Sequence, residues 1–310
     1  QEFAQVLRSS LEAVVAQMDT EMEGMGHPLV LFNPLGHART EVVTVAGSVP
    51  SPFSTGADIA VRVFDPDGRE VPTLRWASDP DRRVAKHDRL AFTATVPASG
   101  LAVYELRADR GEFYQGPGAP VGWDPATGIL ETTRYRLRLT EAGLVSLVDK
   151  ETGRELLAAP PRLQLLHDTP RSWPAWEIDF DDLMAAPYAE VPLGGVPETV
   201  VAGPDLARLT FTHEAAGSTF RQTLTVANDR LDWTLDINWA TRATLLKAAF
   251  FTTARDTAVT YDLGLGTIRR GINRPRLYEV PAQRWADLTD ASGAFGLTLM
   301  NDGRHGWDHP

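Results

Sequence analysis

The sequence predicts a mainly β protein that opens with one helix, continues as a small β-sandwich and ends in a large antiparallel sandwich. From Leu29 onward, short apolar runs alternate with Gly, Pro, Asn and Asp turn signals, a pattern typical of successive strands. Only the first segment repeats its apolar residues at helical spacing. The 310 residues can bury at least one large core, and we expect two domains plus an appendage.

Composition narrows the classes of partner. The chain carries 30 Lys and Arg against 41 Asp and Glu, a net charge of −11, which argues against nucleic acid or an anionic membrane as a partner. Charges interrupt its apolar runs well short of a bilayer-spanning length, and no signal segment opens the chain, so we expect a cytoplasmic location. The lack of cysteine excludes disulfides and thiolate metal ligands.

Residues 1–23 predict an amphipathic helix, which Gly24, Gly26 and Pro28 end. Its apolar residues follow one another at spacings of three and four and form a single stripe: Phe3, Val6, Leu7, Leu11, Val14, Val15 and Met18. One helix cannot bury such a stripe alone, so it docks on the rest of the chain or belongs to a helical bundle. We assign residues 1–26 to this element.

Residues 27–110 predict a small antiparallel β-sandwich, because short strands follow one another without a helical period between them. Strands are expected at 29–32, 40–45, 59–64, 70–76, 90–96 and 101–107. We interpret Asn33, which precedes Pro34, as a turn residue that bonds the local backbone, in preference to a ligand-binding role. The Gly- and Pro-rich residues 111–128 predict a linker.

Residues 129–310 predict a second and larger β-domain. Between residues 133 and 139, Tyr135, Leu137 and Leu139 share one face of a strand while three arginines share the other. Strict alternation of apolar and polar residues over 231–239 indicates a long, half-buried strand. Strands of this length predict a large two-sheet sandwich.

The densest polar and aromatic cluster lies between Gly266 and Asp308. It contains Gly-Thr-Ile-Arg-Arg at 266–270, Tyr-Glu-Val at 278–280, Arg-Trp-Ala-Asp-Leu at 284–288 and Asn-Asp-Gly-Arg-His-Gly-Trp-Asp at 301–308. In order and spacing these motifs resemble the late β-domain of glycoside hydrolase family 38, the α-mannosidases. Gly271 stands where that family usually has Pro, Asn273 where it often has His, and Arg304-His305 where Lys-Tyr is usual.

This resemblance implies that residues 1–26 are the last helix of a truncated bundle and that residues 129–310 form a supersandwich of the galactose mutarotase-like type. It also implies that a catalytic α/β domain lies outside this chain and holds a divalent metal, usually zinc, between two His and two Asp. The partners would be that domain and a mannose-containing glycan, and a homo-oligomer stays open. The opening at Gln1 and the end at Pro310 favour a fragment.

Arg270 and Glu279 are the first two candidates for contacts with substrate or with the catalytic domain. A guanidinium donates several hydrogen bonds in a fixed geometry, either to neighbouring hydroxyls or to a carboxylate across an interface. The alternative is a structural ion pair between Arg270 and Glu279 or Asp287.

Asn301, Asp302 and Arg304 are the other three candidates. A loop at this position can bring Asn301 and Asp302 to a substrate, but a turn before Gly303 explains these two residues equally well.

We predict no catalytic residue and no metal ligand in this chain. Retaining glycoside hydrolysis needs two carboxylates about 5 Å apart, and adjacent acids such as Asp181 and Asp182 do not establish that geometry. The histidines and their acidic neighbours lack the spacing of a strong metal motif, and we interpret them as solvated polar residues: His167, Asp168, His305, Asp308 and His309.

Two tryptophans lie three positions apart at Trp173 and Trp176, with an arginine and carboxylates close by. Such a segment can form a platform on which a sugar ring stacks. The related family has Trp-Asp-Ala-Trp-Asp here, and Pro174 and Glu177 replace both aspartates. We therefore favour a structural corner in which buried tryptophans act as anchors.

Two hypotheses of different classes follow. In the first, the chain is the C-terminal β-rich portion of a retaining family 38 α-mannosidase, which supports the catalytic domain and completes its sugar pocket. In the second, it is a stand-alone carbohydrate-binding or adhesion module. A mutarotase-type epimerase would need a His and a Glu in one cleft, and no motif singles out such a pair.

Overall fold

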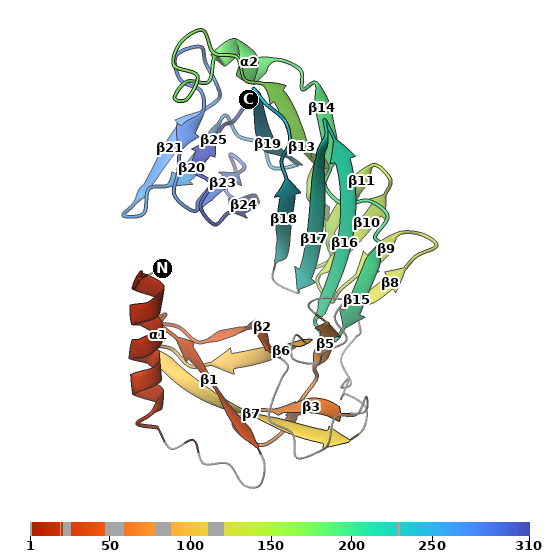
Figure 1. Cartoon of the computed structure of the whole chain (residues 1–310), viewed down its shortest axis with the longest axis vertical. Helices are drawn as coiled ribbons and strands as arrows, with labels where there is room; N and C mark the ends of the chain where they lie inside the picture. The colour runs from red at the N-terminus through yellow and green to blue at the C-terminus, as the bar shows by residue number, and fades with distance from the viewer. Residues whose placement is uncertain are drawn as a thin grey trace. The chain divides into compact units, whose positions relative to one another are not determined.

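The computed structural model describes residues 2–18, 20, 26–46, 59–77, 88–110, 121–227 and 230–310, and Figure 1 shows its helices and strands. The chain divides into two compact units. Unit 1 comprises Gln1–Gly122, Val201–Arg208 and Thr225–Leu231, and unit 2 comprises Trp123–Val200, Leu209–Leu224 and Asp232–Pro310. Within the described ranges, no helix has both the length and the apolar character that crossing a bilayer requires.

The N-terminal helix α1 (Glu2–Val15) is shorter than expected. It ends in the β-branched pair Val14 and Val15, and the amides of Gln17 and Met18 then bond carbonyls three residues back, so the last turn tightens and stops. Residues 21–25, where the expected helix ended, lie outside the described residues. The side chains of Val6, Leu7 and Val14 are about half exposed or more, as expected for a stripe without a full partner.

Unit 1 contains two antiparallel sheets with strand orders β1-β7-β3-β4 and β2-β6-β5. Their strands are β1 (His27–Asn33), β2 (Arg39–Ala46), β3 (Ile59–Phe64), β4 (Glu70–Val71), β5 (Leu74–Ala77), β6 (Asp88–Val96) and β7 (Gly100–Arg110). The expected strand at 70–76 is thus two strands, separated by Pro72 and Thr73.

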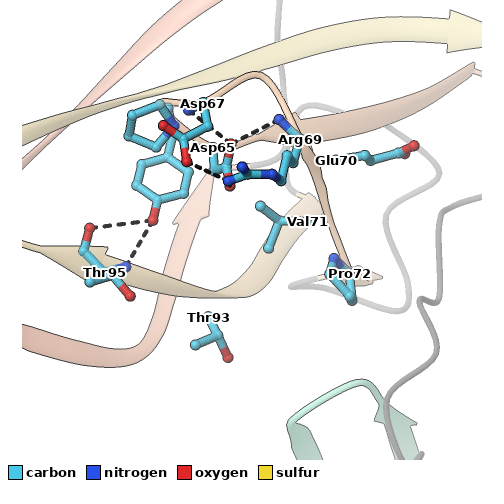
Figure 2. A pocket seen from close by; sticks show the side chains of 10 residues that line it. Asp65, Asp67, Arg69, Glu70, Val71, Pro72, Thr93 and Thr95 are labelled. Carbon is cyan, nitrogen blue, oxygen red and sulfur yellow. Dashed lines mark hydrogen bonds and ion pairs between the residues drawn. The ribbon is translucent and has the colours of Figure 1, made fainter.

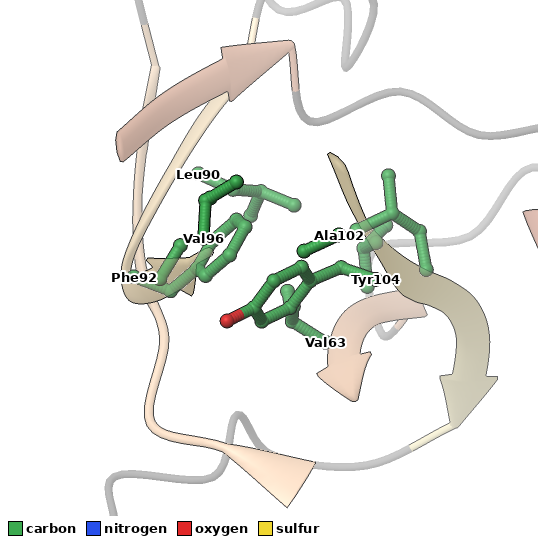
Figure 3. Packing of buried hydrophobic residues seen from close by; sticks show 9 residues of the cluster. Val63, Leu90, Phe92, Val96, Ala102 and Tyr104 are labelled. Atoms are coloured by element: carbon green, nitrogen blue, oxygen red, sulfur yellow. The ribbon is translucent and has the colours of Figure 1, made fainter. Parts of the chain in front are cut away.

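The core of unit 1 lies between these sheets, and Figure 3 shows its packing. Val63, Leu90 and Phe92 are almost fully buried there. The rings of Phe92 and Tyr104 meet with their centroids 5.4 Å apart. The Tyr104 hydroxyl accepts a hydrogen bond of 2.8 Å from the backbone N–H of Thr95. The two antiparallel sheets and the core that they share confirm the small sandwich predicted from the sequence.

Asn33 serves the turn as interpreted. Its side chain is 2 % exposed, accepts from the Leu35 N–H at 3.1 Å, and donates to the carbonyls of His37 at 2.8 Å and Pro97 at 2.9 Å. The buried amide therefore joins the turn after β1 to the turn after β6.

The remaining strands form several further antiparallel sheets, most of them in unit 2. They are β8 (Gly122–Asp124), β9 (Ile129–Glu131), β10 (Tyr135–Thr140), β11 (Gly143–Asp149), β12 (Arg154–Glu155), β13 (Leu157–His167), β14 (Ala189–Pro192), β15 (Thr199–Gly203), β16 (Leu206–Ala215), β17 (Ser218–Ala227), β18 (Leu231–Asn238), β19 (Thr244–Thr252), β20 (Ala258–Asp262), β21 (Thr267–Gly271), β22 (Val280–Pro281), β23 (Trp285–Thr289), β24 (Gly296–Met300) and β25 (Gly306–Trp307).

The expected strand faces are present in this part of the chain. Tyr135, Leu137 and Leu139 are buried in β10, and the apolar residues of β18 alternate with exposed polar ones. β8 lies inside the range expected as a linker and belongs to the sheet of order β12-β11-β10-β9-β8, while residues 111–120 lie outside the described residues. The mainly β fold class with large antiparallel sheets is confirmed.

Candidate functional site

The C-terminal motifs occupy two neighbouring pieces of unit 2. β20, β21, β23 and β24 form a sheet of order β21-β20-β23-β24, and β22 pairs with β25. Arg270 lies in β21, Glu279 directly precedes β22, and Asn301, Asp302 and Arg304 lie in the loop between β24 and β25. The fold thus gathers all five predicted residues on the strands and loops of this one region, the last in the chain (Figure 1).

The Arg270 side chain binds a backbone carbonyl. Its Nη1 donates a hydrogen bond of 2.7 Å to the carbonyl of Pro281, and its Cζ lies 5.8 Å from the ring centroid of Tyr261. Among the described residues, Arg270 forms no ion pair with Glu279 or Asp287, and Asp287 instead accepts the hydroxyls of Thr289 and Thr298. Arg270 therefore connects β21 to β22.

Asn301 stabilises a turn, whereas its neighbours Asp302 and Arg304 lie on the surface. The Asn301 side chain accepts the Arg304 N–H at 2.6 Å, and Gly303 takes a φ of 91°, which a residue with a side chain adopts rarely. Asn301 therefore builds the turn, as one of the two interpretations expected. Asp302 and Arg304 are exposed, so their charges are available to a ligand or a partner domain.

A set of four residues, which we call the C-terminal polar cluster, lies behind this loop: Lys247, Asn273, Glu279 and Asp308. Lys247 Nζ lies 2.6 Å from Asp308 Oδ2, and their side chains are only 18 % and 13 % exposed. Asn273 Nδ2 donates to the same oxygen at 3.1 Å. The backbones of Asn273 and His309 are also joined, by an N–H to carbonyl bond of 2.8 Å. The ion pair and these bonds hold the residues after β25 in place.

Lys247 was missed in the sequence. The signal was a single charge inside the otherwise apolar run of β19, Thr-Leu-Leu-Lys-Ala-Ala-Phe-Phe-Thr. Lysine is almost never buried unless it is paired, so this position predicts a partner without naming it. The partner, Asp308, comes from the far end of the chain, which only the folded structure shows.

Glu279 is the half-buried carboxyl of this cluster. Burial raises its pKa, the positive charge of Lys247 lowers it, and the nearby carboxylates of Asp308 and Asp168 raise it further. Its Oε1 lies so close to Gly306 that a Cβ at that position would approach it to 2.5 Å. A side chain at position 306 would therefore have to push the Glu279 carboxylate aside.

Two buried groups next to this cluster also have raised pKa values. Burial raises the pKa of Tyr261 to about 12, the charge of Asp308 adds to the shift and that of Arg270 opposes it, so the hydroxyl stays protonated at neutral pH. Burial also raises the pKa of Asp168, with Asp182 contributing, and Asp168 Oδ1 is a buried oxygen without a hydrogen-bond partner.

The loop of residues 168–179, which we call the tryptophan loop, corrects an expectation. Trp173 and Trp176 are 69 % and 86 % exposed, so they are not buried anchors. Carboxylates anchor the loop instead, because Asp182 accepts the Thr169 N–H at 2.8 Å and Asp179 accepts the Arg171 N–H at 3.2 Å. Local hydrogen bonds to carboxylates thus hold the corner that buried rings were expected to hold.

The tryptophan loop is tied to the C-terminal motifs. The hydroxyl of Tyr278 donates to the carbonyl of Ile178 at 2.7 Å, and the rings of Tyr278 and Phe180 lie 5.2 Å apart. Phe180 begins the short helix α2 (Phe180–Met184). Because Tyr278 directly precedes Glu279, one segment connects the loop to the polar cluster.

The histidines serve local contacts. His167 stacks on Tyr188 with ring centroids 4.6 Å apart, and His305 Nδ1 lies 3.2 Å from the Ala282 carbonyl oxygen. Across the described residues, no three His, Asp or Glu side chains are grouped in a way that could hold a metal ion. The family resemblance places its divalent metal in a catalytic domain outside this chain, and these residues are not proposed as its ligands.

A hollow of about 480 Å³ lies in unit 1, apart from the predicted residues (Figure 2). Asp65, Asp67, Arg69 and Glu70 line it. Asp67 pairs with Arg69, and Glu70 pairs with Arg62 at 2.6 Å from Nε to Oε1. These charged side chains thus already have partners within unit 1, which argues against a charged ligand in the hollow.

Two solved structures show a similar fold over almost the whole chain. A protein in glycosyl hydrolase family 38 from Enterococcus faecalis matches with a TM-score of 0.63 and 17% identity, over 97% of this chain and 41% of that one. An α-mannosidase from Enterococcus faecalis V583 matches with a TM-score of 0.62 and 16% identity, over 97% and 40%. This chain thus spans about two fifths of the length of either protein, and the likeness shows the fold.

The family itself is shown by sequence. A search of curated proteins finds no significant match. The model of the glycosyl hydrolases family 38 C-terminal domain matches residues 130–309, which is more than half of the chain and contains every predicted site residue. The chain therefore belongs to glycosyl hydrolase family 38, and residues 130–309 are its C-terminal domain.

Proposed function

We propose that this chain is the C-terminal β-rich part of a retaining α-mannosidase, and that it completes the sugar pocket of a catalytic α/β domain outside the chain. The observation that carries the proposal is the match of residues 130–309 to the family's C-terminal domain. The name of one structural neighbour, an α-mannosidase, supports the substrate class. The length of both neighbours beyond the matched part leaves room for a catalytic domain.

In this proposal Asp302 and Arg304, the exposed charged side chains of the loop between β24 and β25, contact the sugar. The carboxylate of Asp302 accepts hydrogen bonds from hydroxyls, and the guanidinium of Arg304 donates to them. Asn301 shapes the turn that presents both, and Arg270 fixes the backbone of β22 beside it. Glu279 and the rest of the polar cluster hold the segment after β25 in position.

No step of bond cleavage is assigned to this chain. Retention needs a nucleophile and an acid/base about 5 Å apart across the anomeric carbon. The carboxylates of the polar cluster are half-buried or paired with Lys247, which suits a supporting role. The nucleophile and the divalent metal, usually zinc in this family, belong in the proposal to the catalytic domain.

The test is to express the full reading frame that contains this chain and to assay an aryl α-mannoside. We expect activity from the full product and none from the 310-residue chain alone. Asp302→Ala and Arg304→Ala should each lower kcat/KM by about 10- to 100-fold, since each removes a hydrogen bond to a charged group. Arg138→Ala, an exposed arginine on β10, is the matched control and should leave kcat/KM unchanged.

Arg270→Ala should lower activity with little loss of folding, because Arg270 supports β22 through a single hydrogen bond to a carbonyl. Unchanged kinetics with a large drop in melting temperature would make Arg270 a structural residue only. Sugar binding by the chain together with an inactive full product would favour the stand-alone carbohydrate-binding module instead.

A further inference from the structure

The two most exposed aromatic side chains of the described residues stand together on the tryptophan loop. Trp173 and Trp176 are 69 % and 86 % exposed, whereas the next most exposed aromatic side chain, Phe32, is at 47 %. Exposed indoles are uncommon on surfaces that only face water, since an indole is mostly apolar and is enriched where a partner covers it. The pair therefore indicates a contact surface.

The loop holds the two rings in a preformed arrangement. Trp173 adopts a φ of 54°, a left-handed conformation that bulky residues rarely take. Its carbonyl accepts the N–H groups of Trp176 at 2.7 Å and Glu177 at 3.0 Å, which fixes the spacing of the two indoles along the backbone. Arg171 and Tyr278 brace the two ends of the loop. A ligand would therefore meet a surface that needs little ordering.

Polar groups on the same loop decide between classes of partner. Arg171 and Asp181 form an ion pair of 2.8 Å that is itself largely exposed, and Glu177 beside Trp176 is also exposed. An apolar protein surface would strip water from this ion pair and from the Glu177 carboxylate, at a large desolvation cost. A pyranose instead offers an apolar C–H face to an indole and hydroxyls to the charged groups.

We propose that Trp173 and Trp176 form a sugar-stacking platform on which one pyranose ring of a glycan rests, with hydroxyls bound by Arg171 and Glu177. The platform deepens the proposed function, because the Tyr278 hydroxyl ties this loop to the segment that carries Glu279. A glycan whose terminal mannose reaches the loop between β24 and β25 would place a further ring on the platform. The platform itself is inferred from the residues of the tryptophan loop alone.

The experiment titrates the 310-residue chain with α-linked mannobiose and follows the indole N–H signals by NMR. We expect the signals of Trp173 and Trp176 to shift together. Trp173→Ala and Trp176→Ala should each weaken binding by about tenfold, the loss expected for one stacking contact. Leu265→Ala is the matched control, because Leu265 is a fully exposed apolar residue of the same unit, and it should bind like the unchanged chain.

Because both rings are exposed, these variants should keep the circular dichroism and melting temperature of the parent chain. The proposal is overturned if mannobiose leaves both indole signals in place, or if the tryptophan variants bind it as tightly as the Leu265→Ala control. It is also overturned if these variants lower the melting temperature of the full reading frame without any effect on sugar binding, which would make the loop a contact between domains.

Failure of the platform and failure of the proposed function give different results. If the platform is correct and the full product is a mannosidase, Trp176→Ala raises KM for an oligosaccharide and leaves the aryl α-mannoside unaffected. Indole shifts in a protein that never hydrolyses mannosides would keep the platform and remove the proposed function. Normal hydrolysis with no indole shifts would keep the proposed function and remove the platform.

Discussion

The two charged regions of this protein differ in how their charges find partners. In the hollow of unit 1, Arg69 pairs with Asp67 two positions away, and both side chains are about 70 % exposed. In the C-terminal polar cluster of unit 2, Lys247 comes from β19 and Asp308 from the residues after β25, and both are largely buried. The first region pairs its charges locally in water, and the second brings distant segments together in a site of low dielectric.

This difference indicates which of the two regions depends more strongly on its charges. An exposed local pair gains little because water already solvates both charges. A buried pair is costly to assemble, and burial raises the pKa values of Glu279 in the cluster and of Asp168 next to it. Ionisable groups whose pKa values are shifted in this way are found at functional sites more often than elsewhere. The following variants test the contrast, beginning with the largest expected effect.

Lys247→Met should destabilise the chain by about 3–5 kcal/mol, because it leaves Asp308 buried and uncompensated. Urea unfolding measures the loss, and Lys247→Arg, which keeps the charge, should recover much of it. The pKa of Glu279 should rise further in Lys247→Met, since the lysine charge lowers it. A loss below that of an exposed pair would show that the cluster is solvated like the hollow.

Gly306→Ala should destabilise the chain by about 1 kcal/mol, because the new Cβ would lie 2.5 Å from Glu279 Oε1 and the flexible end of that side chain must move aside. A double-mutant cycle tests whether the contact with Glu279 causes this loss of stability. In a Glu279→Ala background the same glycine substitution should cost little, whereas full additivity would place the clash elsewhere.

Glu279→Gln should change the pH dependence of stability more than its value at acid pH. Burial raises the pKa of Glu279 above that of an unfolded glutamate, so the native state binds the proton more tightly. The stabilisation is complete below the unfolded pKa and is lost as pH rises through the folded pKa. The parent chain should therefore lose more stability than Glu279→Gln between pH 4 and neutrality, as thermal melting at each pH would show.

Arg69→Met should have the smallest effect, within about 1 kcal/mol, because it breaks an exposed pair that water can replace. High salt should reduce even that effect. A loss comparable to that of Lys247→Met would mean that the hollow, too, depends on its charges.

Much of the fold could be predicted from sequence because its signals are local. The alternation in Tyr135, Leu137 and Leu139 and along β18 named the buried faces, and Asn33 before Pro34 named a turn. The helix end was wrong by more than one turn, since periodicity continued to Met18 while the hydrogen bonds tightened after Val15. Apolar periodicity reports a face and not a terminus.

The site was predictable only in part. Motif spacing selected Arg270, Glu279 and the loop between β24 and β25 as candidates, and the fold places them in one region, while their contact with a sugar or a catalytic domain stays a prediction. It misassigned Trp173 and Trp176, since an apolar residue in a sequence is equally consistent with a core and with a contact surface. Whether Arg270 meets a carboxylate or a carbonyl depends on how β21 approaches β22, which no spacing encodes.

The sequence by itself determined the strand faces, the turn at Asn33 and the family motifs, because each depends on residues a few positions apart. Tertiary structure alone decided that Lys247 meets Asp308, that Gly306 makes room for Glu279, and that carboxylates anchor the tryptophan loop and leave its rings exposed. The physical reason is that Lys247 and Asp308, like Gly306 and Glu279, come from segments separated by several strands, and that the exposure of the rings depends on how the rest of the chain packs around their loop. Their geometry follows from the packing of the strands between them, not from the order of the residues.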